Sequence, residues 1–143
     1  MAGMKKGAYQ DRLAKVSLFS SLSKRDLQRI SSHATSHRAF AGEELTREGR
    51  PGYEFFVIGE GRAVVRRKGR KVASLKKGDF FGELALLDRV PRNATVVAET
   101  DMELWVLDGR EFGAVLREVP EIAVKILAIL ARRLSAADAK ALH

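Results

Sequence analysis

The feature that most constrains the fold is a series of closely spaced turn signals through the middle of the chain. Between about residues 35 and 108, glycines and a Pro-Gly pair interrupt the sequence every few residues. The segments between them are short, and five are strand candidates: Tyr53 to Ile58, Ala63 to Arg67, Val72 to Leu75, Thr95 to Ala98 and Glu103 to Leu107. Because strands at roughly 8–12-residue spacing pair most simply with their neighbours, they favour an antiparallel β-roll or jelly roll over a parallel sheet.

Helical patterns flank this region on both sides. Residues 1–34 are predicted to be helical, with Ser23 and Asp26 in a spacing that resembles a capping box. Residues 109–143 return to helical periodicity. We therefore expect one mainly β domain over residues 1–143, in which N-terminal and C-terminal helices flank a β-roll at 35–108.

Two helices are expected after the last strand. Asp108 can cap the first of them, with Glu111 three positions later, and Pro120 can begin the second. The second helix carries an apolar stripe wide enough either to cover a pocket or to pair with a second copy: Ile122, Ile126, Ile129, Leu130 and Leu134.

Composition narrows the class of protein. The 143 residues include no Cys, which excludes disulfides, thiolate catalysis and Cys-ligated zinc. No apolar run reaches the roughly 18 residues that a membrane span needs. We expect a cytoplasmic protein without a membrane partner.

The formal net charge of +8 is concentrated in one stretch. Between Gly61 and Gly78 there is no acid, and the basic residues are Arg62, Arg66, Arg67, Lys68, Arg70, Lys71, Lys76 and Lys77. One interpretation is a docking surface for nucleic acid or an acidic protein. The other is a solvated hairpin edge, whose charges prevent aggregation of strand with strand. No aromatic residue interleaves the charges, as single-strand binding would require, so nucleic acid is not the expected partner.

The segment over residues 80–96 contains the residues that are expected to bind a ligand. Gly82 permits close approach of the backbone, and a short helix that begins there offers free N–H groups to an anion. Glu83 would repel a phosphate but accepts a hydrogen bond from a hydroxyl. Arg92 follows Pro91 and can return to the same place with a fork of donors. Together these residues indicate a ligand in which a phosphate lies beside a ribose hydroxyl.

A structural interpretation of the same residues stays open. Glu83 could cap the positive end of the short helix, and Arg92 could pair with Glu83 and leave the pocket empty.

A metal site and a catalytic site are both disfavoured. His33 and His37 have the spacing of one helix face, but Ala34 to Ser36 looks like a helix end and no third ligand is near in sequence. No Ser lies in a nucleophile elbow and no pair of acids is marked for general catalysis. We expect a sensor that is not an enzyme and has no cofactor or metal.

The same segment resembles a known family. Phe81 to Leu87 and Pro91 to Val96 look like the phosphate-binding cassette of cyclic nucleotide-binding domains, which include regulatory subunits of cyclic-AMP-dependent protein kinase and catabolite activator proteins. The resemblance extends to Leu18-Phe19, to the glycines at 59, 61 and 78, and to Glu111-Phe112. It implies a β-roll with a short phosphate-binding helix.

The resemblance also implies roles for single residues. Glu83 would hold the ribose 2′-hydroxyl, and Arg92 the exocyclic phosphate oxygens. The whole implied ligand set is Gly82, Glu83, Leu84, Ala85, Arg92, Asn93, Val65 and Val72, of which the two valines match positions that line the base pocket. Asn93 departs from the Ala, Ser or Thr that is common in the family, so the base stays open between cyclic AMP, the expected ligand, and cyclic GMP.

By the same resemblance, the last helix would transmit the signal when ligand binds. A DNA-reading or kinase domain is not present in the 143 residues, so we expect either a free-standing receptor that acts on a protein effector or the sensor of a larger protein. The alternative function is an interaction protein without a ligand, which docks an acidic protein or nucleic acid on the basic hairpin.

Overall fold

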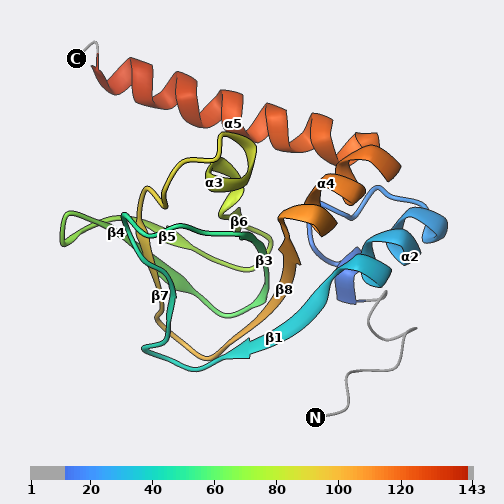
Figure 1. The fold of residues 1–143 in the computed structure, drawn as a ribbon, viewed down its shortest axis with the longest axis horizontal. Coiled ribbons are helices and arrows are strands. Elements are labelled where there is room, and N and C mark those ends of the chain that lie inside the picture. The colour runs from blue at the N-terminus through green and yellow to red at the C-terminus, as the bar shows by residue number, and fades with distance from the viewer. Residues whose placement is uncertain (1–11, 142–143) are drawn as a thin grey trace.

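A computed structural model describes residues 12–141, with side chains through residue 136. It contains two four-stranded antiparallel sheets, ordered β1-β8-β3-β6 and β2-β7-β4-β5. Their strands are β1 (Thr35–Ala39), β2 (Glu44–Thr46), β3 (Glu54–Glu60), β4 (Ala63–Arg67), β5 (Arg70–Leu75), β6 (Phe80–Phe81), β7 (Thr95–Ala98) and β8 (Met102–Asp108). The predicted antiparallel β-roll with flanking helices is confirmed (Figure 1).

Two helices, at Ser23 and Asp108, begin at the predicted caps, but the predicted helical part over residues 1–34 is only partly helical: residues 15–23 form turns and irregular backbone, and residues 1–11 lie outside the described residues. The helices are α2 (Lys24–His33), α3 (Glu83–Leu87), α4 (Gly109–Glu118) and α5 (Pro120–Ala141). Oγ of Ser23 accepts a hydrogen bond from the Asp26 amide at 3.1 Å. Oδ1 of Asp108 accepts from the Glu111 amide at 2.8 Å. These caps satisfy amides that have no partner within the helix.

Strand prediction succeeded where hydrophobic residues mark the segment. β4 and β7 have the predicted bounds, β5 begins two residues earlier than predicted, and β3 and β8 differ from prediction by one or two residues at each end. β1, β2 and the two-residue strand β6 were not among the five strand candidates. β1 exposes four of its five residues and β2 has only three residues, so neither carries a clear hydrophobic pattern.

β3 divides the core into two parts. Phe55 and Val57 point to one side of the sheet, where they join a cluster with residues of α2, α4 and α5. Phe56 and Ile58 point to the other side, into the interior of the roll. This explains why five consecutive residues of the strand are buried.

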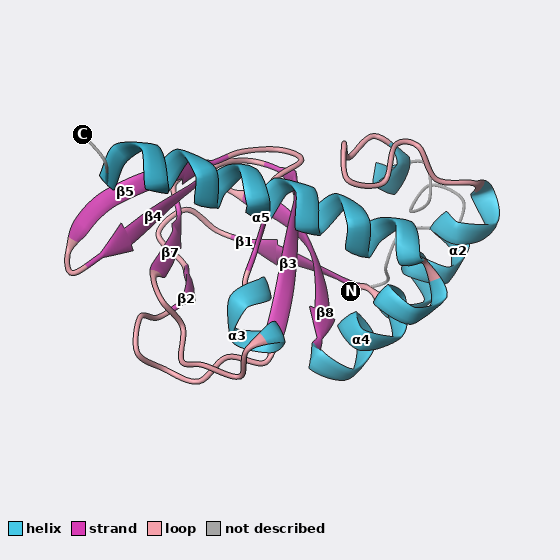
Figure 2. Cartoon of the chain, turned by 90° about the horizontal axis from the view of Figure 1, so that it is seen from above, coloured by secondary structure: helices cyan, strands magenta, loops and turns pink. Residues whose placement is uncertain are grey.

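The long helix α5 crosses the molecule. Its first half packs into the helical core, with Ile122 and Ile126 buried. Seen from above, α5 continues from α4 over the sheets toward β4 and β5 (Figure 2). In Figure 1 the short helix α3 lies directly below it. None of the helices that the structure describes is long and apolar enough to cross a bilayer.

Candidate functional site

The site is built on the turn between β6 and α3. Gly82 connects them with a φ of 94°, in the left-handed region that favours glycine. A Cβ at this position would lie 2.6 Å from the carbonyl oxygen of Glu54 and 2.8 Å from Nη1 of Arg92. Only glycine therefore lets the chain turn sharply into α3 and keep Arg92 against the backbone.

Arg92 is buried at the same turn, with 7% of its surface exposed. Its Nη1 donates to the carbonyl of Gly82 at 3.1 Å, and its Nη2 donates to the carbonyl of Glu54 at 2.8 Å. The guanidinium passes so close to Gly52 that a Cβ there would lie 1.7 Å from Nε. Burial lowers the pKa of Arg92, against the opposing effect of the carboxylates of Glu54 and Glu83. The group is fixed in place and keeps further N–H donors for a ligand.

Glu83, the first residue of α3, has only 4% of its surface exposed. Burial raises the pKa of Glu83 above its usual value, while its own backbone amide, Arg133 and Arg92 act in the opposite direction. Among the residues that the structure describes, its ion-pair partner is Arg133, at 3.5 Å. The pairing with Arg92 that the sequence left open is not seen.

Arg133 is the site residue that the sequence prediction missed. It comes from α5, and its guanidinium lies 5.0 Å from the ring centroid of Phe80. In helical phase it follows Ile122, Ile126 and Leu130 on the face that packs against the protein. A charged residue that continues a core-facing stripe was the available signal. The prediction placed Leu134 on that stripe, but Leu134 is 64% exposed.

The other predicted site residues differ in how much of their surface is exposed. Ala85 is buried, Leu84 is 42% exposed, and the side chain of Asn93 is exposed. The carbonyl of Asn93 accepts a hydrogen bond from Nε of Arg67 at 3.1 Å, which joins the cassette to the β4–β5 hairpin. The remaining two predicted ligand residues, the half-buried Val65 and the half-exposed Val72, lie on that hairpin. The structure thus places Gly82, Glu83 and Arg92 at one turn, where Arg92 contacts the carbonyl of Gly82, and it connects Asn93 to the hairpin.

The two histidines are separate and have structural roles. His33 ends α2, and its ring contacts Glu111 and Glu118 of α4. Nε2 of His37 lies 3.0 Å from Glu43. The sequence could not show the partners of His33, because the acids that contact it are 78 and 85 residues away. In the described part of the chain, no group of three or more potential ligands is arranged to hold a metal.

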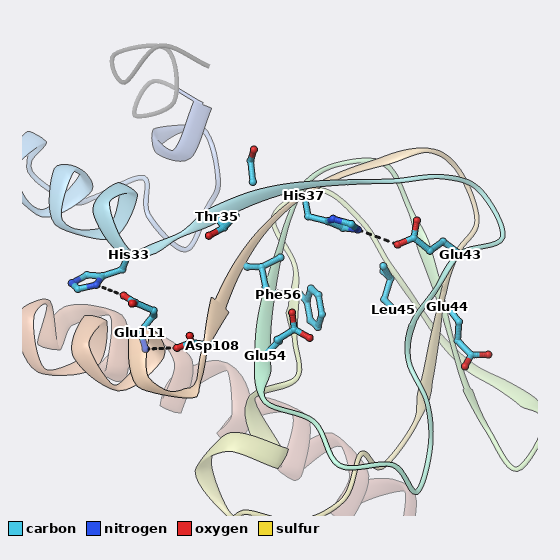
Figure 3. Close-up of a pocket in the computed structure, with 12 residues that line it drawn as sticks. His33, Thr35, His37, Glu43, Glu44, Leu45, Glu54, Phe56, Asp108 and Glu111 are labelled. Carbon is cyan, nitrogen blue, oxygen red and sulfur yellow. Dashed lines mark hydrogen bonds and ion pairs between the residues drawn. The ribbon is translucent and has the colours of Figure 1, made fainter. Parts of the chain in front are cut away.

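Two cavities lie beside the site rather than within it. One, of about 540 Å³, opens between β1, β2, β3 and β8, and Figure 3 shows Glu54, Phe56 and Leu45 around it. Its lining includes neither Glu83 nor Arg92. The other, of about 460 Å³, lies against α3 and is lined mainly by apolar residues, including Ala85, Leu86, Val90 and Pro91.

Curated relatives share this sequence over most of its length. The chain is 36% identical over 111 residues to a cAMP-dependent protein kinase regulatory subunit from Hypocrea atroviridis, covering 78% of this chain and 24% of the relative. It is 38% identical over 125 residues to a putative potassium channel protein from Rhodopseudomonas palustris, covering 85% of this chain and 30% of the relative. The chain therefore spans a third or less of these relatives.

Solved structures share the fold. PKAR CBD2 bound to Sp-2Cl-cAMPS aligns with a TM-score of 0.78 and 28% identity, covering 94% of this chain and 92% of that one. The catabolite activator protein of Thermus thermophilus aligns with a TM-score of 0.79 and 31% identity, covering 86% and 60% of the two chains. The family model of the cyclic nucleotide-binding domain matches residues 37–119, which include β3 to β8 and the whole cassette. By fold, by sequence and by the turn that buries Glu83 and Arg92 together, this chain belongs to the cyclic nucleotide-binding domain family.

Proposed function

We propose that the chain binds cyclic AMP at the cassette and acts as a non-catalytic regulatory module, with cyclic GMP as the alternative ligand. One observation carries the proposal: Glu83 and Arg92 are both buried at one turn of the backbone, yet they do not pair with each other. Burying an ionised group is costly unless a partner satisfies it. Backbone carbonyls satisfy Arg92 in part and Arg133 satisfies Glu83 in part, and a ligand with a phosphate beside a hydroxyl would satisfy the rest of both groups.

The donors and acceptors match such a ligand. Two N–H groups of Arg92 bond to backbone carbonyls, and the remaining donors of its guanidinium are available for phosphate oxygens. Arg133 contacts Oε1 of Glu83, so the other carboxylate oxygen can accept from the ribose 2′-hydroxyl. Gly82, Leu84 and Ala85 form the turn that approaches the phosphate. Cyclic AMP is supported because it occurs bound in related structures, such as PfPKA-R.

The hairpin and Asn93 would contact the base. Val65 and Val72 offer apolar surface on β4 and β5, and half of the surface of Val72 is exposed. The exposed side chain of Asn93 can both donate and accept hydrogen bonds, so it suits either purine. By the family resemblance, Asp138 of the last helix is a further candidate for a base contact. Its side chain is outside the part of the chain that the structure describes.

Ligand binding would be coupled to the position of α5. Arg133 joins α5 to Glu83, the same carboxylate that would hold the ribose. A ligand that binds between Glu83 and the hairpin therefore has more contacts when α5 lies across the cassette. Different affinity for two positions of α5 is sufficient for a switch. Through this movement the module would act on a protein effector or on further domains of the same protein.

The experiment that tests the function is isothermal titration with cyclic AMP and with cyclic GMP. We expect cyclic AMP to bind, and Arg92→Ala to weaken its binding by about 2–4 kcal/mol, or about 30- to 1,000-fold, because the variant removes charge-assisted hydrogen bonds to the phosphate. Arg110→Ala is the matched control, since Arg110 is exposed on α4. Thermal melts of each variant report folding. If neither nucleotide binds at high micromolar concentration, the proposed function is wrong.

A further inference from the structure

The β4–β5 hairpin holds the charge excess of the whole protein. Its eight Lys and Arg residues lie between Gly61 and Gly78 with no acid among them, and the formal net charge of the chain is also +8. The rest of the chain is therefore formally neutral. In Figure 1 the hairpin extends at the end of the molecule opposite α2. The molecule has one strongly basic end.

Most of these charges have no carboxylate partner among the residues that the structure describes. At the base of the hairpin, Arg62 pairs with Glu99 at 3.5 Å and Lys77 pairs with Glu60 at 3.1 Å. Toward the tip, the described part of the chain offers no acidic partner to the side chains of Arg66, Arg67, Lys68, Arg70, Lys71 and Lys76. All six are exposed. A negatively charged partner would interact favourably with each of these side chains. Because the charged groups lie at the surface, the contact would remove little water from the protein.

The same hairpin presents an open sheet edge. β5 stands at the end of its sheet, with β4 as its hydrogen-bonded neighbour on one side. Five of its six residues are exposed, including Val72 with 51% of its surface. An edge strand of this length displays unpaired N–H and C=O groups that can template another strand.

The hairpin is held in a fixed position before any partner arrives. Nε of Arg67 donates to the carbonyl of Asn93 at 3.1 Å. The amide of Lys68, at the turn, donates to Oε1 of Glu48 at 2.9 Å. Because the strands are already ordered, a partner would lose less free energy in binding than it would to a mobile loop.

We propose that β5 docks an extended acidic segment of a partner protein, which adds to the sheet edge as a further strand. Main-chain hydrogen bonds would provide the alignment, and the basic side chains would select a segment rich in Asp and Glu. The same charges repel β5 of a second copy, so the edge selects against self-association. The absence of aromatic residues from the hairpin disfavours single-stranded nucleic acid. This surface goes beyond nucleotide binding and does not depend on it.

The test measures, by fluorescence anisotropy, how tightly the full chain binds a short fluorescent peptide of alternating Glu and Val. Arg70→Glu combined with Lys71→Glu should weaken binding by about 10-fold or more. Lys24→Glu combined with Arg25→Glu makes the same change of net charge on exposed residues of α2, and should change binding by no more than about 2-fold. Thermal melts check that both variants fold.

Two further probes separate strand addition from simple charge attraction. A peptide of the same charge with Pro in place of alternate Val cannot form a strand and should lose binding. The Glu-Val peptide should also slow amide hydrogen exchange within β5. The proposal is overturned if the Pro peptide binds equally, if both charge-reversal variants weaken binding alike, or if a DNA duplex binds more tightly than the peptide at the same salt.

Discussion

At the scale of the residue, the site depends on two glycines as much as on its charges. Gly82 lets the chain turn into α3, and Gly52 leaves the space that the guanidinium of Arg92 fills. A side chain at either position would displace Arg92 from the carbonyls that hold it. The buried arginine is therefore positioned by the backbone and not by the neighbouring carboxylate. This leaves Glu83 to contact α5.

Arg133→Ala tests that contact. We expect cyclic AMP affinity to fall by about 2- to 5-fold, because a partly exposed ion pair contributes at most about 1 kcal/mol to holding α5 across the cassette. The measurement is isothermal titration, with Arg132→Ala as the exposed neighbour for comparison. Unchanged or tighter binding by Arg133→Ala would show that α5 does not close over the ligand through this residue.

At the scale of the element, His33 connects α2 to α4. Its Nδ1 contacts Glu111 and its Nε2 lies 2.9 Å from Glu118, so both ring nitrogens face carboxylates and both must donate. Nη1 of Arg29 donates to the Glu118 carbonyl at 3.3 Å and also lies 3.5 Å from Asp26. Arg29 and His33 therefore both join α2 to the end of α4, and the two contacts of His33 require a protonated imidazole.

The connection predicts a pH dependence of stability. Burial lowers the pKa of His33, but hydrogen bonds to Glu111 and Glu118 outweigh it, so the pKa is raised above the usual value. The stabilisation is fully present when the pH is below the pKa of His33 in the unfolded chain. It is lost as the pH rises through the higher pKa of His33 in the folded protein. We expect His33→Gln to lower Tm by about 2–4 °C at about pH 5.5, and by less at about pH 8.5.

The comparison for this variant is His37→Gln, whose ring is more exposed and contacts one carboxylate. We expect a smaller change of Tm for it. An equal loss of Tm by His33→Gln at both pH values would contradict a stabilising role of the protonated ring.

At the scale of the whole molecule, α5 has two apolar faces, of which one packs against the protein and the other is exposed. Ile122, Ile126 and Leu130 pack against the protein. On the outer side, Val124, Leu127 and Leu134 are each exposed by about two-thirds, at 65%, 64% and 64%. With Ala131 they repeat at intervals of three and four residues, which is the spacing of a coiled-coil seam. We propose that a second copy covers this outer stripe.

Leu127→Lys tests the proposed dimer. A charge in the middle of the seam should convert dimer to monomer, because it would be buried without a partner. Analytical ultracentrifugation of the wild type and the variant measures the state of each. Arg132→Ala, on a different face of α5, should leave the wild-type assembly unchanged. If the wild type is a monomer at the same concentration, the proposal that a second copy covers the outer stripe is wrong.

The sequence by itself determined the class of fold, the starts of three helices and the position of the cassette. Turn glycines and short hydrophobic runs defined the roll, because their effects act within a few residues. Ser23, Asp108 and Pro120 marked helix starts for the same reason. Glu83 and Arg92 could be predicted as neighbours because only nine positions separate them in the sequence.

Only the tertiary structure decided which groups from distant segments meet. Arg133 lies 50 residues from Glu83, and the carbonyl that holds Arg92 belongs to Glu54, 38 residues away. The same holds for the acids around His33 and for the exposed edge of β5, which depends on the order of strands in the sheet. Local patterns record how a segment folds, whereas contacts of this kind depend on how separate segments pack against one another.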